Sequence, residues 1–390
     1  MSQRVGIEVS IAAAEAAALA NVDVIAAYPI TPQTHIVEHL ADLTADGSLD
    51  AEYLAVESEH SAISACMGAV AAGARTFTAS ASQGLALMHE ILFAASSMRA
   101  PMVMAVANRA VSAPINIWAD HSDIMPQRDT GWGQVFAQNG QEVFDLILQA
   151  FKVSENHQVQ LPIMVNMDGF IVSHMIEAIE MLDRDEVNSF LPPMNPVRML
   201  DPKAPRSVGT FGAQNVYTEV KMAQDVALQH SAEIWQEVWQ EYGDKFGQRY
   251  SAVDGLFTED ADIVFVTMGA ISETARSAVE SMRKEGEKVG LVNIRLWRPF
   301  PEEELKKAIG NAKTIAVIDR MLSPGSQAGP VGLEVRSAYS TGSEHPDIHD
   351  FVMGLGGRQI SRKTFKQLVS DIKANMYVPE KYHLYDARIK

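Results

Sequence analysis

Cysteine is nearly absent from the chain, which has only Cys66 among its 390 residues. A single thiol excludes a disulfide within the chain. It also excludes an all-cysteine iron–sulfur cluster or a cysteine-rich zinc site held by this chain alone. Cys66 stands in the apolar run AISACMGAVAAG, a setting typical of a buried, inert thiol.

Basic residues and long apolar runs are scarce as well. The chain has 32 Lys and Arg against 49 Asp and Glu, a formal net charge of -17. Binding to a nucleic-acid backbone needs clustered Lys and Arg, so this balance argues against such a partner. No run of eighteen apolar residues occurs, and the alanine-rich N-terminus lacks the basic start of a signal peptide. The sequence therefore predicts no membrane insertion and a cytoplasmic location.

The phosphate-binding loops of common nucleotide-binding domains are missing too. There is no G-x-x-x-x-G-K-[ST] and no convincing G-x-G-x-x-G after a strand, and GLGG at residues 354–357 is a weak signal. HIVEH, residues 35–39, matches the H-x-x-E-H pattern of some zinc peptidases. No obvious third ligand follows it, and Val37 and Leu40 must carry the buried face of that helix, so a zinc hydrolase is disfavoured.

What the chain does contain is an alternation of apolar strands and helices. Hydrophobic residues make up 47% of it and charged residues 21%, which is typical of a globular protein. The runs VDVIAAY, AEYLAV, ARTFTAS, PMVMAVA and LPIMVNM read as strands. Helices are expected over Gly6–Leu19, from about Pro32, over Ser58–Ala72 and Gln83–Ser97, and from about Gly140. Strands without polar alternation suit a parallel sheet buried on both faces, built from right-handed βαβ units.

A second alternating block begins near Glu259, so we predict two doubly wound α/β domains. The first, residues 1–245, ends in a Pro-rich wrapping segment over residues 189–212 and a long polar helix over Thr218–Phe246. The second covers residues 255–390. The aromatic spacing of Trp235, Trp239 and Tyr242 in the long helix indicates core or interface packing.

Three stretches in the first domain could carry chemistry. In AYPITPQT, residues 27–34, Thr31 is a candidate N-cap and Pro32 a candidate first helical residue. In VESEHSA, residues 56–62, Ser58 could cap a helix. Glu59 is either an ordinary acid of a first helical turn or a carboxylate that exchanges a proton. Arg109 follows a strand and is either a surface residue or a clamp for a carboxylate.

Together, several motifs resemble one enzyme family. The motifs AYPITPQT, VESEHSA, FTASASQGL, ANRAVSAPINIWADHSD and MDGFIVSH occur in the order and spacing found in the alpha subunit of thiamine-diphosphate-dependent 2-oxoacid:acceptor oxidoreductases, the pyruvate:ferredoxin oxidoreductase family. VTMGAISETA, KVGLVNIRLWRPFP and AVIDR extend the resemblance over nearly the whole chain. The resemblance implies a pyrimidine-binding domain followed by a domain like the transketolase C-terminal domain.

The resemblance also implies roles for single residues. Glu59 falls on the family's cofactor-activating glutamate, which would hydrogen-bond the aminopyrimidine ring and favour its imino tautomer. Pro29 and Ile30 would lie against the cofactor. Thr31 would offer a hydroxyl to the substrate, and Arg109 would pair with the 2-oxoacid carboxylate. The reaction implied is oxidative decarboxylation of the 2-oxoacid, with the acyl group passing to coenzyme A.

This chain would then hold half of an active site. It shows no motif for the cofactor diphosphate and its Mg²⁺, so a beta subunit is expected to carry that domain. With one cysteine it cannot carry the [4Fe-4S] clusters, which are expected on partner subunits. Gamma and delta type subunits are expected in the assembly, with ferredoxin or an NAD-linked flavoprotein subunit as the electron acceptor.

The substrate is narrowed but left open. Thr31 stands where relatives that use oxalate are expected to carry Arg, and NRAVSAPIN lacks the glycines expected for 2-oxoglutarate. Pyruvate-like, branched or aromatic 2-oxoacids are favoured, and Ala119 beside Trp118 hints at an aryl substrate such as phenylglyoxylate. Two alternatives stay open: a transketolase-like ketol transferase subunit, and a non-catalytic structural subunit.

Overall fold

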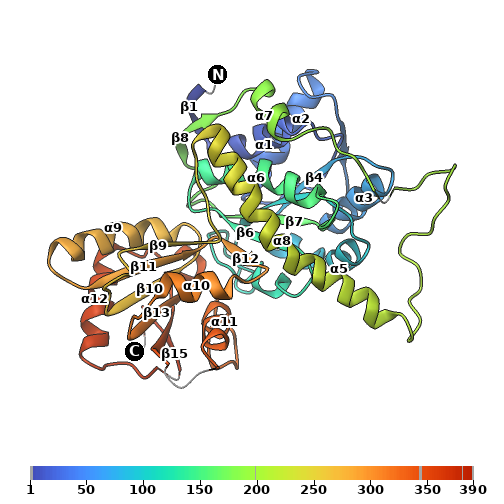
Figure 1. Ribbon diagram of the computed structural model, residues 1–390. Helices are drawn as coiled ribbons and strands as arrows, with labels where there is room; N and C mark the ends of the chain where they lie inside the picture. Colours follow the sequence, from blue (N-terminus) through green and yellow to red (C-terminus); the bar gives the residue numbers. More distant parts are fainter. Residues whose placement is uncertain (1–2, 198, 342–344, 380, 389–390) are drawn as a thin grey trace.

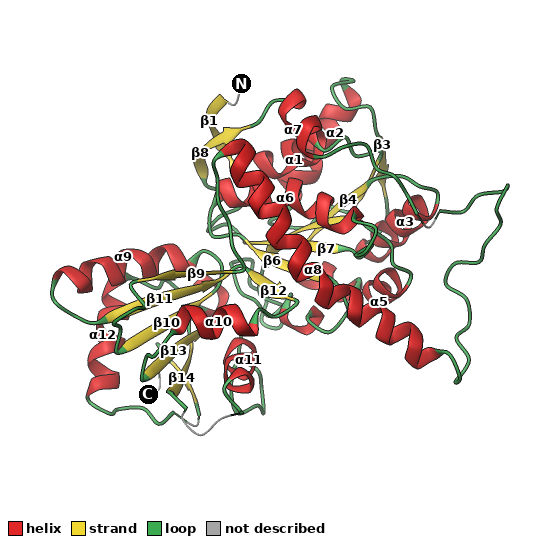
Figure 2. Cartoon of the chain, viewed as in Figure 1, coloured by secondary structure: helices red, strands yellow, loops and turns green. Residues whose placement is uncertain are grey.

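The computed structural model describes residues 3–197, 199–341, 345–379 and 381–388. Its described part forms two largely parallel sheets, each flanked by helices (Figures 1 and 2). The α/β class and the two doubly wound units predicted from the sequence are confirmed. The exact division into residues 1–245 and 255–390 stays a prediction.

The first sheet has seven strands among the described residues, in the order β12-β6-β7-β5-β4-β2-β3. All neighbouring pairs are parallel except β12 with β6. Its strands are β2 (Val24–Ala27), β3 (Glu52–Ala55), β4 (Thr76–Ser80), β5 (Val103–Asn108), β6 (Gly133–Phe136), β7 (Ile163–Asp168) and β12 (Leu296–Arg298). Every residue of β4, β5, β6 and β7 is buried, as the unalternating apolar runs predicted.

Helices cover this sheet and connect its strands. They are α1 (Val9–Leu19), α2 (Thr34–Ala45), α3 (Glu59–Ala71), α4 (Ser82–Leu87), α5 (His89–Ser97) and α6 (Gly140–Glu155), followed by α7 (Arg184–Phe190) and the long α8 (Tyr217–Phe246). A short 3₁₀ turn, η1 (Met125–Gln127), lies inside the long connection after β5. Cys66 in α3 is fully buried, as its apolar surroundings in the sequence predicted, and burial raises its pKa to about 12.

Two strands at the edge of the first unit were not predicted. β1 (Gln3–Glu8) pairs antiparallel with β8 (Ile176–Met181). The helix expected from Gly6 therefore begins at Val9 instead. Both strands are largely exposed and have no long apolar run, so their pairing gives only a weak local signal.

The second sheet has six strands among the described residues, in the order β15-β14-β13-β10-β11-β9, with only β9 antiparallel. Its strands are β9 (Val253–Leu256), β10 (Ile263–Thr267), β11 (Val289–Ile294), β13 (Thr314–Asp319), β14 (Asp347–Val352) and β15 (Tyr382–Leu384). The helices are α9 (Ile271–Lys284), α10 (Glu302–Ile309), α11 (Pro330–Ala338) and α12 (Arg362–Lys373), with a short turn η2 (Leu355–Gly357). One hydrophobic cluster runs from the first sheet onto one face of the second, which couples the two units.

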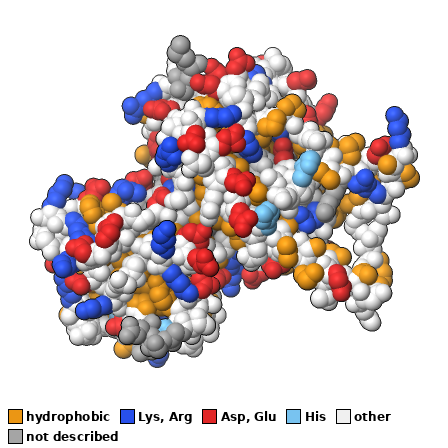
Figure 3. All heavy atoms as spheres, viewed as in Figure 1, with side chains coloured by type: hydrophobic (Ala, Val, Ile, Leu, Met, Phe, Trp, Pro, Cys, Tyr) orange, Lys and Arg blue, Asp and Glu red, His pale blue; other side chains and the backbone are white. Residues whose placement is uncertain are grey.

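The segment between α7 and α8 projects from the body at the right of the view and is mostly exposed (Figure 1). By contrast, α8 lies along the first unit with Trp235, Trp239 and Tyr242 buried. The Tyr242 hydroxyl donates to Asp145 on α6 at 2.7 Å. The core packing predicted for this aromatic stripe is confirmed. On the face shown in Figure 3, acidic and basic side chains are interspersed over both units. In the described part of the chain, none of the helices combines the length and apolar character needed to cross a membrane.

Candidate functional site

The stretch AYPITPQT follows the carboxyl end of β2, but it caps the next helix differently from the prediction. α2 begins at Thr34 with Gln33 as its N-cap, so Thr31 is not the cap and Pro32 is not the first helical residue. The fully buried Gln33 side chain donates to the carbonyl of Tyr28 at 2.9 Å. Its backbone N–H donates to Ile30, also at 2.9 Å. This extra turn was not predicted because Gln is an uncommon cap and its side chain bonds backward to the loop.

The turn places the candidate residues of this stretch near the protein surface, beyond the carboxyl end of β2. Pro29 and Thr31 are exposed, and Ile30 is half-buried. The carbonyl of Thr31 accepts a hydrogen bond of 2.9 Å from Nη1 of Arg109. The structure therefore brings Thr31 and Arg109 together, through the backbone of Thr31. In the described chain the Thr31 hydroxyl makes no hydrogen bond, so it is available to a ligand.

Arg109 follows β5 directly and its side chain is anchored from both sides. Its Nε donates to the carbonyl of Asn116 at 3.0 Å, in addition to the bond from Nη1 to Thr31. The residue is only 6% exposed. Burial lowers the pKa of Arg109, while Asp123 acts in the opposite direction. Within the described residues, Nη2 has no hydrogen-bond partner, so this edge of a fixed guanidinium can receive an anionic group.

Asp123 connects the Arg109 loop to the loop before α4. Its Oδ2 accepts from the backbone N–H groups of Ser82 and Arg109, at 2.9 Å each. Its Oδ1 accepts from Asn108 at 3.2 Å. Burial raises the pKa of this carboxyl to about 7, and the three hydrogen bonds oppose that rise. The sequence motif contained Asp123, but its role depends on contacts with Ser82 that are 41 positions away in the chain.

Glu59 is the first residue of α3, next to the predicted N-cap. Ser58 caps the helix as expected, because its Oγ accepts from the backbone N–H of Ser61 at 3.2 Å. The Glu59 side chain is only 6% exposed, yet within the described ranges its carboxylate makes no hydrogen bond or ion pair. Buried carboxylates are almost always satisfied. The oxygens of Glu59 are not among the fully enclosed atoms without a partner, so a ligand can reach this largely buried carboxylate.

Gly84 makes room for that carboxylate. A Cβ on residue 84 would lie 2.4 Å from Oε1 of Glu59, closer than real Cβ atoms come to a neighbour. Gly84 lies on α4, two residues after Ser82, whose backbone Asp123 holds. Glu59 and Arg109 are thus linked through a short series of contacts that includes Gly84, Ser82 and Asp123. This role of Gly84 was not predicted, since nothing local in FTASASQGL requires a glycine there.

The second unit closes over the Arg109 loop. Asn116 Nδ2 donates to the carbonyl of Gly356 at 3.1 Å, and the N–H of Gly356 donates to Asp120 at 3.0 Å. The N–H of Gly357 donates to the carbonyl of Ala119 at 2.8 Å. The GLGG turn, a weak phosphate-loop candidate, instead uses its backbone to hold the loop that positions Arg109.

A buried ion pair fixes the two units further. Asp168, at the end of β7, accepts from Arg320 at 2.5 Å, from His121 at 3.2 Å and from the N–H of Ala270 at 2.7 Å. Burial alone would raise the pKa of the Asp168 carboxyl, but Arg320 and His121 hold it well below its usual range. The contact is electrostatic and fully buried, so it favours one arrangement of the two units.

HIVEH does not form an i,i+4 metal pair. His35 bonds to Glu8 and His39 bonds to Glu15, each at 2.7 Å. The glutamates come from different elements, β1 and α1, so each histidine attaches α2 to a different neighbour. The sequence argument against a zinc hydrolase built on both histidines agrees with this separation.

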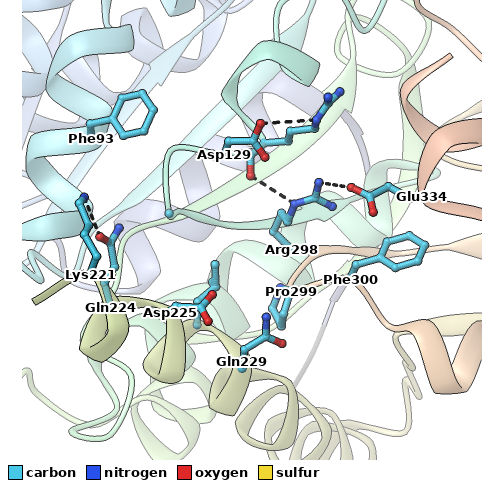
Figure 4. Close-up of a pocket in the computed structure, with 13 residues that line it drawn as sticks. Phe93, Asp129, Lys221, Gln224, Asp225, Gln229, Arg298, Pro299, Phe300 and Glu334 are labelled. Atoms are coloured by element: carbon cyan, nitrogen blue, oxygen red, sulfur yellow. Dashed lines mark hydrogen bonds and ion pairs between the residues drawn. The ribbon is translucent and has the colours of Figure 1, made fainter. Parts of the chain in front are cut away.

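A cavity of about 540 Å³ is lined by other residues of the chain (Figure 4). It is lined by α5 and α8 on one side and by Arg298 and Glu334 on the other. Several of its charged groups already have partners: Arg298 pairs with Glu334, and Lys221 donates to Gln224 at 3.0 Å. None of the predicted site residues lines it, and we assign it no chemistry.

Comparison with known proteins gives two family-level matches. A family described as "Pyruvate flavodoxin/ferredoxin oxidoreductase, thiamine diP-bdg" matches residues 15–240. One described as "Pyruvate:ferredoxin oxidoreductase core domain II" matches residues 261–365. Between them they include every candidate residue named above and most of both sheets.

Individual relatives belong to the same kind of enzyme as these two family matches indicate. The chain is 46% identical to pyruvate synthase subunit PorA of Methanocaldococcus jannaschii, covering 93% of each chain. It is 46% identical to ketoisovalerate oxidoreductase subunit VorA of Pyrococcus furiosus, covering 93% of this chain and 92% of the relative.

Among solved structures, 2-oxoglutarate:ferredoxin oxidoreductase from Magnetococcus marinus superposes with a TM-score of 0.71 at 17% identity. The match covers 96% of this chain and 65% of that one. A split-gene transketolase gives a TM-score of 0.50 at 12% identity, covering 86% of each chain. At these identities both structures support the fold alone.

Proposed function

We propose, since the chain belongs to the pyruvate:ferredoxin oxidoreductase family as an alpha subunit, that it supplies the pyrimidine half of a thiamine diphosphate site and a clamp for the substrate carboxylate. Its relatives are subunits of oxidoreductase enzymes. The reaction proposed is oxidative decarboxylation of a 2-oxoacid to an acyl-CoA and CO₂. The observation that carries the proposal is the buried, unpartnered carboxylate of Glu59.

The residues present fit the pyrimidine ring. Glu59 offers a carboxylate oxygen that no described protein group occupies, in a space that Gly84 keeps open. An ionised carboxylate accepts hydrogen bonds only, so it favours a ring nitrogen that carries a proton. Pro29 and Ile30, on the stiff turn after β2, are proposed to lie against the same ring. When bound, thiamine diphosphate supplies the electron sink for decarboxylation.

Arg109 is proposed to hold the 2-oxoacid carboxylate. The bonds to Thr31 and Asn116 fix its guanidinium and leave Nη2 for the substrate. A preorganised guanidinium loses less entropy on binding a carboxylate than a free side chain does. The exposed Thr31 hydroxyl is proposed to contact the substrate from the facing turn.

The remaining components are assigned to partner subunits. A beta subunit is proposed to carry the diphosphate-binding domain with its Mg²⁺. The [4Fe-4S] clusters are proposed to lie on the beta and delta-like chains, and a gamma type subunit is also expected in the assembly. Ferredoxin or an NAD-linked flavoprotein subunit would accept the electrons, and coenzyme A would accept the acyl group. We propose that the assembly works in the cytoplasm. Family membership favours this activity over a ketol transferase or a purely structural role.

A small aliphatic 2-oxoacid is the favoured substrate. Relatives named as pyruvate synthase and ketoisovalerate oxidoreductase subunits are about equally similar to this chain. Ala119, the basis of the phenylglyoxylate prediction, is fully buried beneath the GLGG turn, so its small size does not widen an open pocket. A substrate panel of pyruvate, 2-oxoisovalerate, indolepyruvate and phenylglyoxylate, with ferredoxin, viologen or NAD⁺, would rank these candidates.

Glu59→Gln in the assembled complex tests the proposal. We expect turnover to fall by about a hundredfold or more, because a placed acid–base group contributes on that order. Glu57→Gln is the matched control, since Glu57 is exposed in the same motif and bonds only to Ser61 in the described chain. Equal turnover of the two variants would remove the role assigned to Glu59.

A further inference from the structure

Three residues from separate segments meet beside the first sheet. Glu8 ends β1, His35 lies in the first turn of α2, and His174 lies in the loop after β7. His35 bonds to Glu8 at 2.7 Å, and the rings of His35 and His174 are 4.7 Å apart. All three side chains are partly buried. No function proposed above uses this cluster.

Its geometry is close to that of a metal site. One ligand atom from each residue lies within 4.8 Å of the other two. An ion placed between three such atoms would lie at most about 2.8 Å from each of them. Zn²⁺ is bound at about 2.0–2.2 Å by His nitrogen or carboxylate oxygen. Side-chain movements of less than about 1 Å would close that difference.

The backbone around His174 is held firmly. The Ser173 carbonyl accepts two hydrogen bonds from Ser10, one from its backbone N–H at 2.9 Å and one from the Ser10 hydroxyl at 2.7 Å. Ser173 Oγ lies 2.8 Å from Nδ1 of His174 and accepts from the N–H of Phe170 at 2.9 Å. Metal-binding histidines usually have one ring nitrogen held by a hydrogen bond, and a site at His174 that kept this bond would use Nε2.

The chemical types of the three side chains indicate which metal ions the site could bind. Two imidazoles and one carboxylate suit Zn²⁺ and similar divalent transition metals, and they are poor ligands for Mg²⁺ or Ca²⁺. His39, on the same helix, pairs with Glu15 but belongs to no such group among the described residues.

We propose that Glu8, His35 and His174 form a binding site for a divalent transition-metal ion of the Zn²⁺ class, with a fourth position open to water. A bound ion would join three segments: the β1–β8 ribbon, α2 and the loop after β7. α2 starts just after the Thr31 turn, so the ion would brace one wall of the proposed active site. The metal itself takes no part in the proposed chemistry.

The test is zinc binding by the full-length chain, measured by competition with a fluorescent chelator and by metal analysis after dialysis. Wild type should bind one ion per chain. Glu8→Gln, His35→Gln and His174→Gln should each weaken binding by about tenfold or more, since each removes a ligand. His39→Gln is the matched control and should bind like wild type. Cys66 does not compete, because it is fully buried.

Co²⁺ binding provides a second readout. Its absorption spectrum would not change on substitution if the three residues had only a structural role. Its visible absorption should show a low-coordinate site with nitrogen ligands in wild type and His39→Gln, and should lose it in His174→Gln. Melting without metal verifies that each variant folds. No stoichiometric zinc binding, or zinc binding that survives both His35→Gln and His174→Gln, would overturn the proposal. Loss of zinc binding does not depend on turnover, so failure here leaves the Glu59 proposal unaffected.

Discussion

Replacing Asp123 by alanine removes the carboxylate that holds two loops of the site together. The backbone N–H groups of Ser82 and Arg109 would lose their acceptor, whereas the Asn108 side chain would keep its second acceptor, Oδ1 of Asn166. Asp123 is 1% exposed, so water has little access to replace it. A buried donor left without a partner costs about 1–3 kcal/mol, so the two N–H groups should lower the free energy of unfolding by roughly 2 kcal/mol or more.

Asp123→Asn is the graded comparison. An amide oxygen can still accept from the N–H groups of Ser82 and Arg109, but the amide nitrogen then faces the donor of Asn108. We expect a loss of about 1–3 kcal/mol for this variant, less than for alanine. Both variants should also raise the KM for the 2-oxoacid, because the guanidinium of Arg109 is held less firmly.

The raised pKa of Asp123 also predicts how the stability of the protein should change with pH. The folded pKa of Asp123 is raised to about 7, above the value of about 3.9 expected when unfolded. Between these values the folded state binds the extra proton, so the contribution of Asp123 to stability is present at low pH and is lost as pH rises through 7. At about 1.4 kcal/mol per pKa unit, the loss is at most about 4 kcal/mol. The asparagine variant lacks this dependence.

Urea unfolding of wild type and both variants, at about pH 5 and about pH 8, measures these terms. The deficit of Asp123→Asn relative to wild type should shrink at the higher pH. The reasoning would be refuted if Asp123→Ala unfolded within about 0.5 kcal/mol of wild type, the range of an ordinary surface substitution. It would also be refuted if the asparagine deficit were the same at both pH values.

Two further substitutions probe the neighbouring groups. Arg109→Ala should raise the KM for the 2-oxoacid about tenfold to a hundredfold, as expected for losing a charged hydrogen bond of about 1.5–3 kcal/mol. Arg128 is a half-buried arginine away from the site, so Arg128→Ala should not raise this KM. An unchanged KM for Arg109→Ala would exclude the proposed carboxylate clamp. Gly84→Ala should reduce thiamine diphosphate affinity and turnover of the complex, because its Cβ would lie 2.4 Å from Oε1 of Glu59. Gly68→Ala on α3, where nothing lies within 4 Å of the added Cβ, is its control; equal activity of the two would show that the close contact is unimportant.

The elements that the sequence predicts well are those with strong local signals. Buried parallel strands such as β5 and β7 are continuous apolar runs, and Ser58 is a standard helix cap. Glu59 and Arg109 could be singled out because each follows a strand, where ligands of α/β sheets bind. Their roles came from the family resemblance.

The features that were missed depend on contacts between distant residues. β1 and β8 are paired across more than 160 positions, and neither has a strong apolar pattern. The turn at Gln33 replaced the expected cap at Thr31 because a buried amide bonds back to Tyr28. Gly84 shows its importance only when Glu59 is placed beside it in space.

The central claim is that this chain holds half of an active site and supplies Glu59 to it. The most direct measurement is oxidation of pyruvate with thiamine diphosphate, Mg²⁺, coenzyme A and a viologen acceptor. It compares the isolated chain with the chain reassembled with its partner subunits. We predict no oxidation by the chain alone, recovery on reassembly with wild type or Glu57→Gln, and little recovery with Glu59→Gln. Oxidation by the isolated chain, or full recovery with Glu59→Gln, would contradict the account.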